Sequence, residues 1–112
     1  MRYAKSKYRN RRLVWDGMEF DSQKECMRYR ELKLLQQAGA ISNLQRQVRY
    51  ELVPSQKIDG KTVERPIFYV ADFVYTENGQ TIVEDVKGVK TDAYIIKRKL
   101  MLYVHGVRIR ET

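Results

Sequence analysis

Residues 67–88 read IFYVADFVYTENGQTIVEDVKG, two runs of β-branched and aromatic residues separated by Asn78-Gly79. This dipeptide is the strongest short signal for a tight antiparallel hairpin. With the turn centred there, the numbers of cross-strand partners have a constant sum, so Asp72 faces Asp85. The stretch therefore predicts two acids side by side across a β-ladder.

Such a pair of acids has a cost, because directly opposed side chains have Cβ atoms about 4.5–5.5 Å apart and like charges there are destabilising. Side chains alternate along a strand, so Lys87 lies on the face of Asp85 and Glu84 on the other. Two carboxylates and an ammonium suit a hard divalent cation with a water beside it. The alternative is a solvated sheet face on which Lys87 neutralises the two acids.

Length and composition narrow the classes of protein. A chain of 112 residues forms one domain. It has no apolar run of membrane-spanning length and no signal-peptide pattern, so we expect it in the cytoplasm. The single Cys26 excludes an internal disulfide, and the single His105 excludes paired-histidine zinc and ribonuclease chemistry. A metal here must be bound by carboxylates, which favours Mg²⁺ or Mn²⁺.

The positive charge is concentrated in residues 1–12. The chain has a formal charge of +8, and this segment holds six basic residues and no acid: Arg2, Lys5, Lys7, Arg9, Arg11 and Arg12. Tyr3 and Tyr8 lie between them, a mixture that suits phosphate contacts and base stacking. We therefore divide the chain into a basic arm, 1–12, and a domain, 13–112. The alternative is a tail that only aids solubility.

The remaining pattern predicts an order of helix, three strands, helix and strand. A short hairpin around Asp16-Gly17 comes first. The expected elements then are a helix over 22–38, strands over 44–53, 63–75 and 81–87, a helix over about 92–105, and a strand over 107–110. The three strands form an antiparallel meander, and the last strand pairs in parallel after a helical crossover. The predicted class is α/β in the α+β sense, with a mixed central sheet.

Each helix has an apolar stripe that we expect to be buried. In the first helix the main stripe is Met27, Leu34, Leu35 and Ala38, with a second along Glu25, Tyr29, Leu32 and Gln36. In the second helix it is Ala93, Ile96, Leu100, Tyr103 and Val104. Glu25 is also the last residue of a capping box begun by Ser22. Its carboxylate could therefore serve to cap the helix rather than to form part of a functional site.

The order of elements, Asp72, the triplet Asp85-Val86-Lys87 and the upstream Glu25 together resemble the PD-(D/E)xK superfamily of restriction-endonuclease-like nucleases. The likeness covers about residues 13–111. Segments 20–25, 29–32, 69–73 and 83–88 look more closely like a family of small phage and prophage proteins of poorly assigned role. The usual proline before the first aspartate is replaced by Ala71, and the usual glutamate of the second motif by Asp85.

The resemblance implies a restriction-endonuclease-like core and a role for each matching residue. Asp72, Asp85 and Glu25 would bind Mg²⁺ or Mn²⁺, and Lys87 would lie beside the attacking water. Glu31 is the alternative acid on the first helix. Phosphate contacts from the second helix would come from four residues: Lys90, Lys97, Arg98 and Lys99. A phage or prophage origin would place the protein in a bacterial host cell.

Two classes of function remain open. The first is a metal-dependent endonuclease that hydrolyses DNA. Specificity for branched or recombining DNA and a homodimer are part of this hypothesis. The second is a non-catalytic nucleic-acid-binding module on the same scaffold. A weaker third reading is an RNA-binding accessory protein, favoured by the tyrosines.

Overall fold

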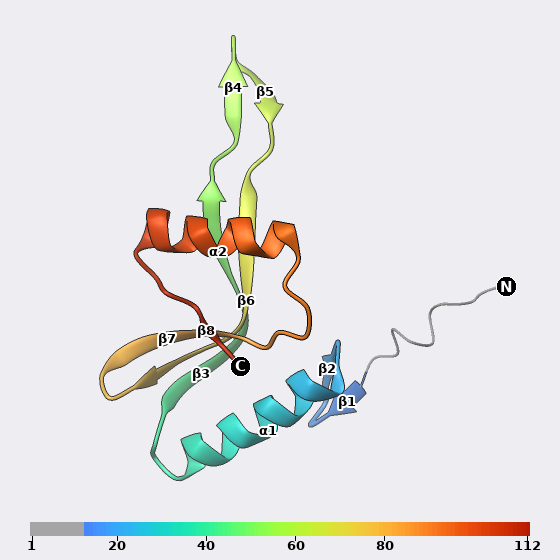
Figure 1. Cartoon of the computed structure of the whole chain (residues 1–112), viewed down its shortest axis with the longest axis vertical. Coiled ribbons are helices and arrows are strands. Elements are labelled where there is room, and N and C mark those ends of the chain that lie inside the picture. The colour runs from blue at the N-terminus through green and yellow to red at the C-terminus, as the bar shows by residue number, and fades with distance from the viewer. Residues whose placement is uncertain (1–12) are drawn as a thin grey trace, which may run out of the picture.

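The computed structural model describes residues 13–112 as two helices and a mixed sheet flanked by two small hairpins (Figure 1). In chain order the elements are β1 (Leu13–Trp15), β2 (Met18–Phe20), α1 (Gln23–Gln37), β3 (Ser42–Val53), β4 (Gln56–Ile58), β5 (Lys61–Glu64), β6 (Ile67–Glu77), β7 (Gln80–Asp85), α2 (Asp92–His105) and β8 (Arg110–Glu111). This order confirms the predicted α+β class. The basic arm, 1–12, lies outside the described residues.

The central sheet has the strand order β3-β6-β7-β8. The first three strands form the predicted antiparallel meander, and β8 pairs in parallel with β7. Several boundaries differ from the prediction: β6 runs on to Glu77, and β7 ends at Asp85, so that Lys87 follows the strand. The strand expected over 63–75 is divided into β5 and β6 at Arg65-Pro66, because proline has no amide to donate to a ladder. The last strand begins at Arg110 and not at Val107.

The tight turns follow from Asx-Gly dipeptides. Asp16, Asp59 and Asn78 have φ of 56°, 52° and 52°, and each is followed by a glycine with positive φ. Two left-handed residues in succession produce the turn whose twist matches that of paired strands. The Asn78 turn keeps β6 and β7 in the predicted register, with Val74 opposite Val83.

The β4–β5 hairpin extends the β3–β6 pair beyond the helices as a free projection (Figure 1). We call residues 54–66 the projecting hairpin. Pro54 and Pro66, the two prolines of the chain, stand at its base. Its apolar side chains, Ile58 and Val63, are 63% and 50% exposed.

Helix α1 begins and ends as predicted, and it buries the second predicted stripe rather than the main one. The Ser22 hydroxyl accepts a hydrogen bond from the Glu25 amide at 3.1 Å, and Gly39 follows the helix with φ of 84°. The buried residues are Glu25, Cys26, Tyr29 and Leu32. The expected main stripe was wrong, since Leu34 is 65% exposed and Met27, Leu35 and Ala38 are exposed too. The aromatic ring of Tyr29 replaces it by packing on Phe73 and on Phe20 of β2.

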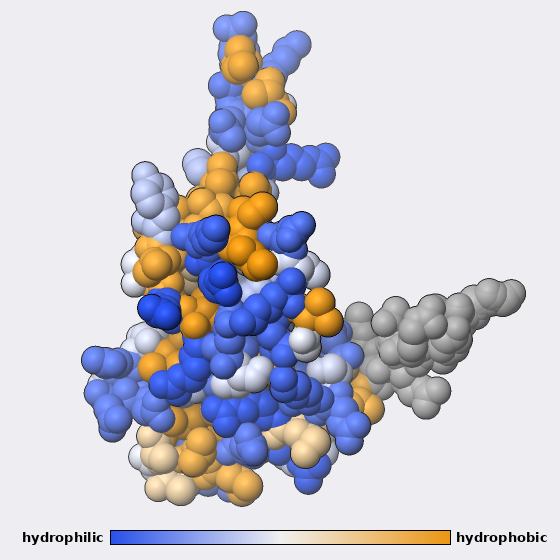
Figure 2. Space-filling view, in the orientation of Figure 1, coloured by the Kyte–Doolittle hydropathy of each residue, from blue (hydrophilic) through white to orange (hydrophobic). Residues whose placement is uncertain are grey.

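Helix α2 also differs from the prediction, because most of its expected apolar stripe is exposed. Thr91 caps its first turn and Gly106, at φ of 67°, ends it. Its buried residues are Tyr94 and Met101, while Ile96, Tyr103 and Val104 are exposed. Tyr103 is 87% exposed. The helix therefore turns the predicted apolar face outward, and Figure 2 shows hydrophobic residues gathered over α2 and the base of the projecting hairpin.

The two helices contact different parts of the bent sheet. Tyr69 and Ala71 pack in a cluster with α2, whereas Phe73 and Tyr75, further along the same strand, pack in a cluster with α1. Figure 1 shows the β3–β6 pair bending between these levels. Asp72 lies between Ala71 of the first cluster and Phe73 of the second.

A buried carboxylate fastens α1 to the sheet. Glu84 on β7 is 0% exposed. It accepts hydrogen bonds from Arg28 Nε at 2.6 Å and Nη2 at 3.0 Å, and from the hydroxyls of Tyr75 and Thr112. Burial alone would raise the pKa of Glu84, but the bonds from Arg28 and Tyr75 outweigh it and lower the pKa. This confirms that Glu84 points away from Lys87.

We expect Glu84→Gln to lower the free energy of unfolding by about 3 kcal/mol, because it leaves the Arg28 guanidinium without its buried counter-charge. Urea denaturation measures this loss. The matched control is Glu31→Gln, which removes the other, exposed partner of Arg28 at 3.0 Å and should cost less than about 1 kcal/mol. Equal losses in the two variants would contradict this account of the helix attachment.

Candidate functional site

Asp72 and Asp85 lie side by side, as the hairpin register predicts. The ladder pairs Phe73 with Glu84, and the two aspartates are the next residues on each strand. The two carboxyl groups interact closely enough for Asp85 to raise the pKa of Asp72. Asp72 Oδ2 also accepts a hydrogen bond from the Val86 amide at 2.8 Å.

The aspartate pair holds a proton that isolated carboxyls would lose. Burial, the hydrogen bond with Asp85 and the charge of Asp85 raise the pKa of Asp72 to about 7. Asp85 is 3% exposed, and its buried Oδ2 has no hydrogen-bond partner of good geometry. The Lys87 ammonium lies 3.1 Å from that oxygen. The site thus has one carboxyl oxygen with capacity for a further positive partner.

Lys87 is held on the predicted face. Its ammonium lies 4.2 Å from the ring centroid of Tyr94, at the start of α2, as well as beside Asp85. Tyr69 lines the same site, and burial followed by the charge of Asp85 raises the pKa of its phenol. Neither tyrosine was singled out from the sequence, because nothing in the pattern separates them from ordinary core aromatics.

Glu25 is buried next to this pair but has partners of its own. Its Oε2 accepts a hydrogen bond from Gln47 Nε2 at 3.1 Å and lies 3.8 Å from Arg46 Nη2. Burial, then the charge of Asp21, raises the pKa of Glu25, and Asp85 adds a smaller contribution. Across residues 13–112, no three acidic, histidine or cysteine side chains are grouped closely enough to hold a metal ion. Glu25 is therefore near Asp72 and Asp85 but does not form a three-carboxylate cluster with them in the described part of the chain.

Gln47 was missed by the sequence reasoning. It lies between Arg46 and Val48 on β3, which pair with Phe73 and Ala71, so it stands opposite Asp72. Its φ is 55°, a left-handed value that costs a non-glycine residue about 1 kcal/mol or more. No turn signal marks the position. The strained backbone places the Gln47 amide on Glu25.

The other predicted residues are placed as follows. The alternative acid, Glu31, is exposed and pairs with Arg28. Lys90 and Arg98 form ion pairs with Glu111 at 2.9 and 3.2 Å, so part of their charge is neutralised within the protein. Lys99 is exposed and Lys97 is half-buried. The six basic residues of the arm lie outside the described range.

The donor set fits Mg²⁺ or Mn²⁺ better than other metals. Magnesium is usually held by one or two carboxylates, with waters and substrate phosphates completing its shell, rather than by a full protein cage. The paired aspartates meet that requirement, and the Asp85 Oδ2, beside the Lys87 ammonium, makes no hydrogen bond of good geometry. A recess of about 260 Å³ beside Glu25, lined also by Glu19, Asp21, Arg46 and Gln47, gives solvent access nearby.

The chain belongs to a family described as a protein of unknown function (DUF1064), which it matches over residues 5–110. No curated protein and no solved structure matches it. Among residues 13–112, no helix is both long and apolar enough to cross a membrane.

We expect Asp72→Asn to stabilise the protein most at alkaline pH. The folded wild type keeps a proton on Asp72 up to about pH 7, whereas the unfolded chain releases it near the ordinary value of 3.8. Wild-type stability therefore falls as the pH rises through this window, and asparagine removes that dependence. Thermal unfolding at about pH 4 and about pH 8 measures it. A Tm difference that is the same at both values would contradict the raised pKa, and Glu64→Gln, on the projecting hairpin, is the control.

Proposed function

We propose that the protein is a metal-dependent endonuclease of PD-(D/E)xK type that hydrolyses DNA phosphodiester bonds, with a preference for branched or recombining DNA. The observation that supports it most is the Asp72–Asp85 pair with Lys87 beside it. Adjacent buried acids are costly to a fold, and perturbed carboxyls of this kind concentrate at functional sites. The restriction-endonuclease-like core is part of the same proposal.

Each residue of the site has a role in this mechanism. Asp72 and Asp85 would bind Mg²⁺ or Mn²⁺, and Glu25 would complete the set. A bound ion would neutralise the negative charge that develops on the phosphate oxygens and would lower the pKa of a water bound to it. Lys87 is held against the Tyr94 ring. From there its ammonium would orient the attacking water at the acid pair.

DNA would be held by the basic residues around the site. Lys97, Lys99 and the basic arm contribute charge to the phosphate backbone, and Lys24, which donates to the Lys87 carbonyl at 2.9 Å, adds a cation next to the site. The domain is too small to read a long sequence by base contacts, which favours recognition of DNA shape.

A homodimer is part of the proposal, since two sites related by two-fold symmetry would address two strands. The outward apolar face of α2 and the unsupported projecting hairpin favour it, because an isolated two-stranded hairpin is marginally stable in water. Sedimentation equilibrium tests the proposed homodimer directly. If the protein is a monomer at every concentration used for cleavage, the homodimer is ruled out.

One observation favours the alternative, a non-catalytic nucleic-acid-binding module. Glu25 is engaged by Gln47 and Arg46, and Lys87 already neutralises Asp85. In that reading the acids are structural and the basic residues alone bind nucleic acid. Branched and linear DNA incubated with magnesium, manganese or a chelator separate the two functions, because the binding module gives no metal-dependent products.

We expect Asp72→Asn and Lys87→Ala each to abolish magnesium-dependent cleavage of branched DNA. The first removes a carboxylate and the second the ammonium beside it, while folding and DNA binding stay largely intact. Gel analysis of products, with circular dichroism and a binding titration, measures the three properties. Glu64→Gln should cut like wild type. If either site variant does so as well, the residue assignment is wrong.

Glu25 requires its own variant, because capping competes with catalysis as the reason for its position. Glutamine at 25 can still accept hydrogen bonds in the first turn but is a poor ligand for a hard cation. We therefore expect Glu25→Gln to keep its Tm near that of wild type and to lose cleavage. Full activity in this variant would shift the helix acid to Glu31, which Glu31→Gln would then test.

A further inference from the structure

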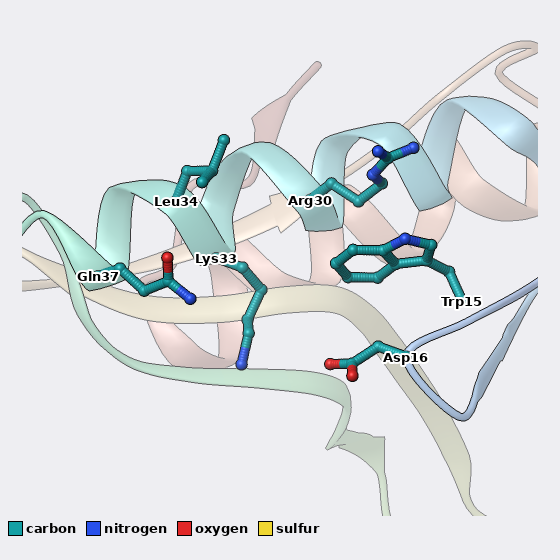
Figure 3. Close-up of a pocket in the computed structure, with 6 residues that line it drawn as sticks. All are labelled: Trp15, Asp16, Arg30, Lys33, Leu34 and Gln37. Carbon is teal, nitrogen blue, oxygen red and sulfur yellow. The ribbon is translucent and has the colours of Figure 1, made fainter.

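The β1–β2 hairpin and α1 enclose a recess that the proposed site does not use. Its volume is about 350 Å³, at the lower end of the range for small-ligand sites. Six residues line it: Trp15, Asp16, Arg30, Lys33, Leu34 and Gln37. Figure 3 shows that four of them come from α1 and two from the hairpin turn.

Trp15 provides a flat and rigid wall. The Arg30 guanidinium carbon lies 5.1 Å from the Trp15 ring centroid, and Tyr29 meets the indole in an edge contact with centroids 5.9 Å apart. These contacts fix the ring while leaving it half-buried, so part of it faces the recess. Aromatic walls of this kind bind nucleobases by stacking, whatever the base.

The polar groups of the recess suit a nucleotide. In Figure 3 the Asp16 carboxylate and the Lys33 ammonium reach toward the same open space from the hairpin and from α1, with the Gln37 amide further along the helix. They offer an acceptor for an exocyclic amine, a cation for a phosphate and an amide that can both donate and accept. With Arg30, the lining carries a net positive charge.

Other recesses next to α1 lack this combination. The one beside Met27 and Glu31 and the one beside Glu25 and Arg46 have no aromatic lining. In sequence, Trp15 follows closely on residues 1–12, where the chain concentrates its basic residues.

We propose that the Trp15 recess binds one nucleobase of an unpaired DNA strand, with its phosphate on Lys33 and Arg30. This inference rests on the proposed function and names the part of the substrate that is read: a single-stranded segment next to the scissile bond. Lys33 follows Glu25 by eight residues on α1, a rise of about 12 Å, so a strand seated here reaches the aspartates within a few nucleotides.

Trp15 is the only tryptophan of the chain, and its fluorescence therefore reports on this recess alone. The full chain is titrated in a chelator, so that no strand is cut, with a short oligo(dT) of about ten nucleotides and with a blunt duplex of equal length. We expect saturable quenching by the single strand and little by the duplex. Equal quenching by both, or none by the single strand, overturns the proposal.

Charge variants identify the phosphate contacts. Arg30→Gln and Lys33→Gln should each weaken oligo(dT) binding severalfold and reduce the slope of log affinity against log salt by about 0.7, the value for one phosphate on a single strand. Lys57→Gln, an exposed lysine on the projecting hairpin, is the matched control and should leave both unchanged. Equal effects in all three variants would indicate diffuse attraction and overturn the assignment.

Trp15→Phe tests the stacking itself while keeping an aromatic ring on Tyr29. Anisotropy of a labelled oligo(dT) should show about tenfold weaker binding, and wild-type affinity would overturn the proposal. Tighter binding of oligo(U) than of oligo(dT) would overturn the assignment to DNA. If the oligonucleotide quenches Trp15 but no metal-dependent cleavage is found, the proposed nuclease activity is rejected and base binding in the recess stands. If DNA is cleaved without quenching, base binding in the recess is rejected and the nuclease activity stands.

Discussion

The structure depends on the buried carboxylate of Glu84. Arg28, Tyr75 and Thr112 surround it with hydrogen bonds, which fixes β7 against α1. Because successive side chains point to opposite faces, securing Glu84 on this side forces Asp85 to the other. The two neighbouring acids therefore differ in their hydrogen bonding. Glu84 accepts hydrogen bonds on both carboxylate oxygens, whereas the buried Asp85 Oδ2 lies beside Lys87 without a hydrogen bond of good geometry. A carboxylate whose hydrogen bonds are all made within the protein stabilises the fold, whereas a carboxylate oxygen that makes no hydrogen bond can accept a ligand.

The parts that the sequence predicted well are those set by local chemistry. The Asn78-Gly79 turn fixed the β6–β7 register, and with it the approach of Asp72 and Asp85 and the face of Lys87. Ser22 marked the start of the first helix, and the ranges predicted for both helices, 22–38 and about 92–105, agree with the structure to within a residue. These features need only a few adjacent residues, so a single sequence contains all the information.

The parts that failed depend on partners distant in sequence. Apolar spacing on α1 and α2 pointed to Leu34 and Tyr103 as core, but the rings of Tyr29, on the second predicted stripe of α1, and of Tyr94 on α2 fill the space on the sheet. The strained Gln47 has no signature, because no glycine or other turn residue beside it marks the position as left-handed. Pairing of Lys90 with Glu111 likewise exists only once β8 is in place.

The prolines at the base of the projecting hairpin separate it mechanically from the rest of the sheet. Neither Pro54 nor Pro66 has an amide hydrogen, so the backbone ladder of β3 and β6 is interrupted before β4 and β5 begin. Insertions, deletions or substitutions beyond that interruption leave the strands around Asp72 undisturbed. The projecting hairpin can therefore change in length or sequence while the Asp72–Asp85 pair keeps its geometry.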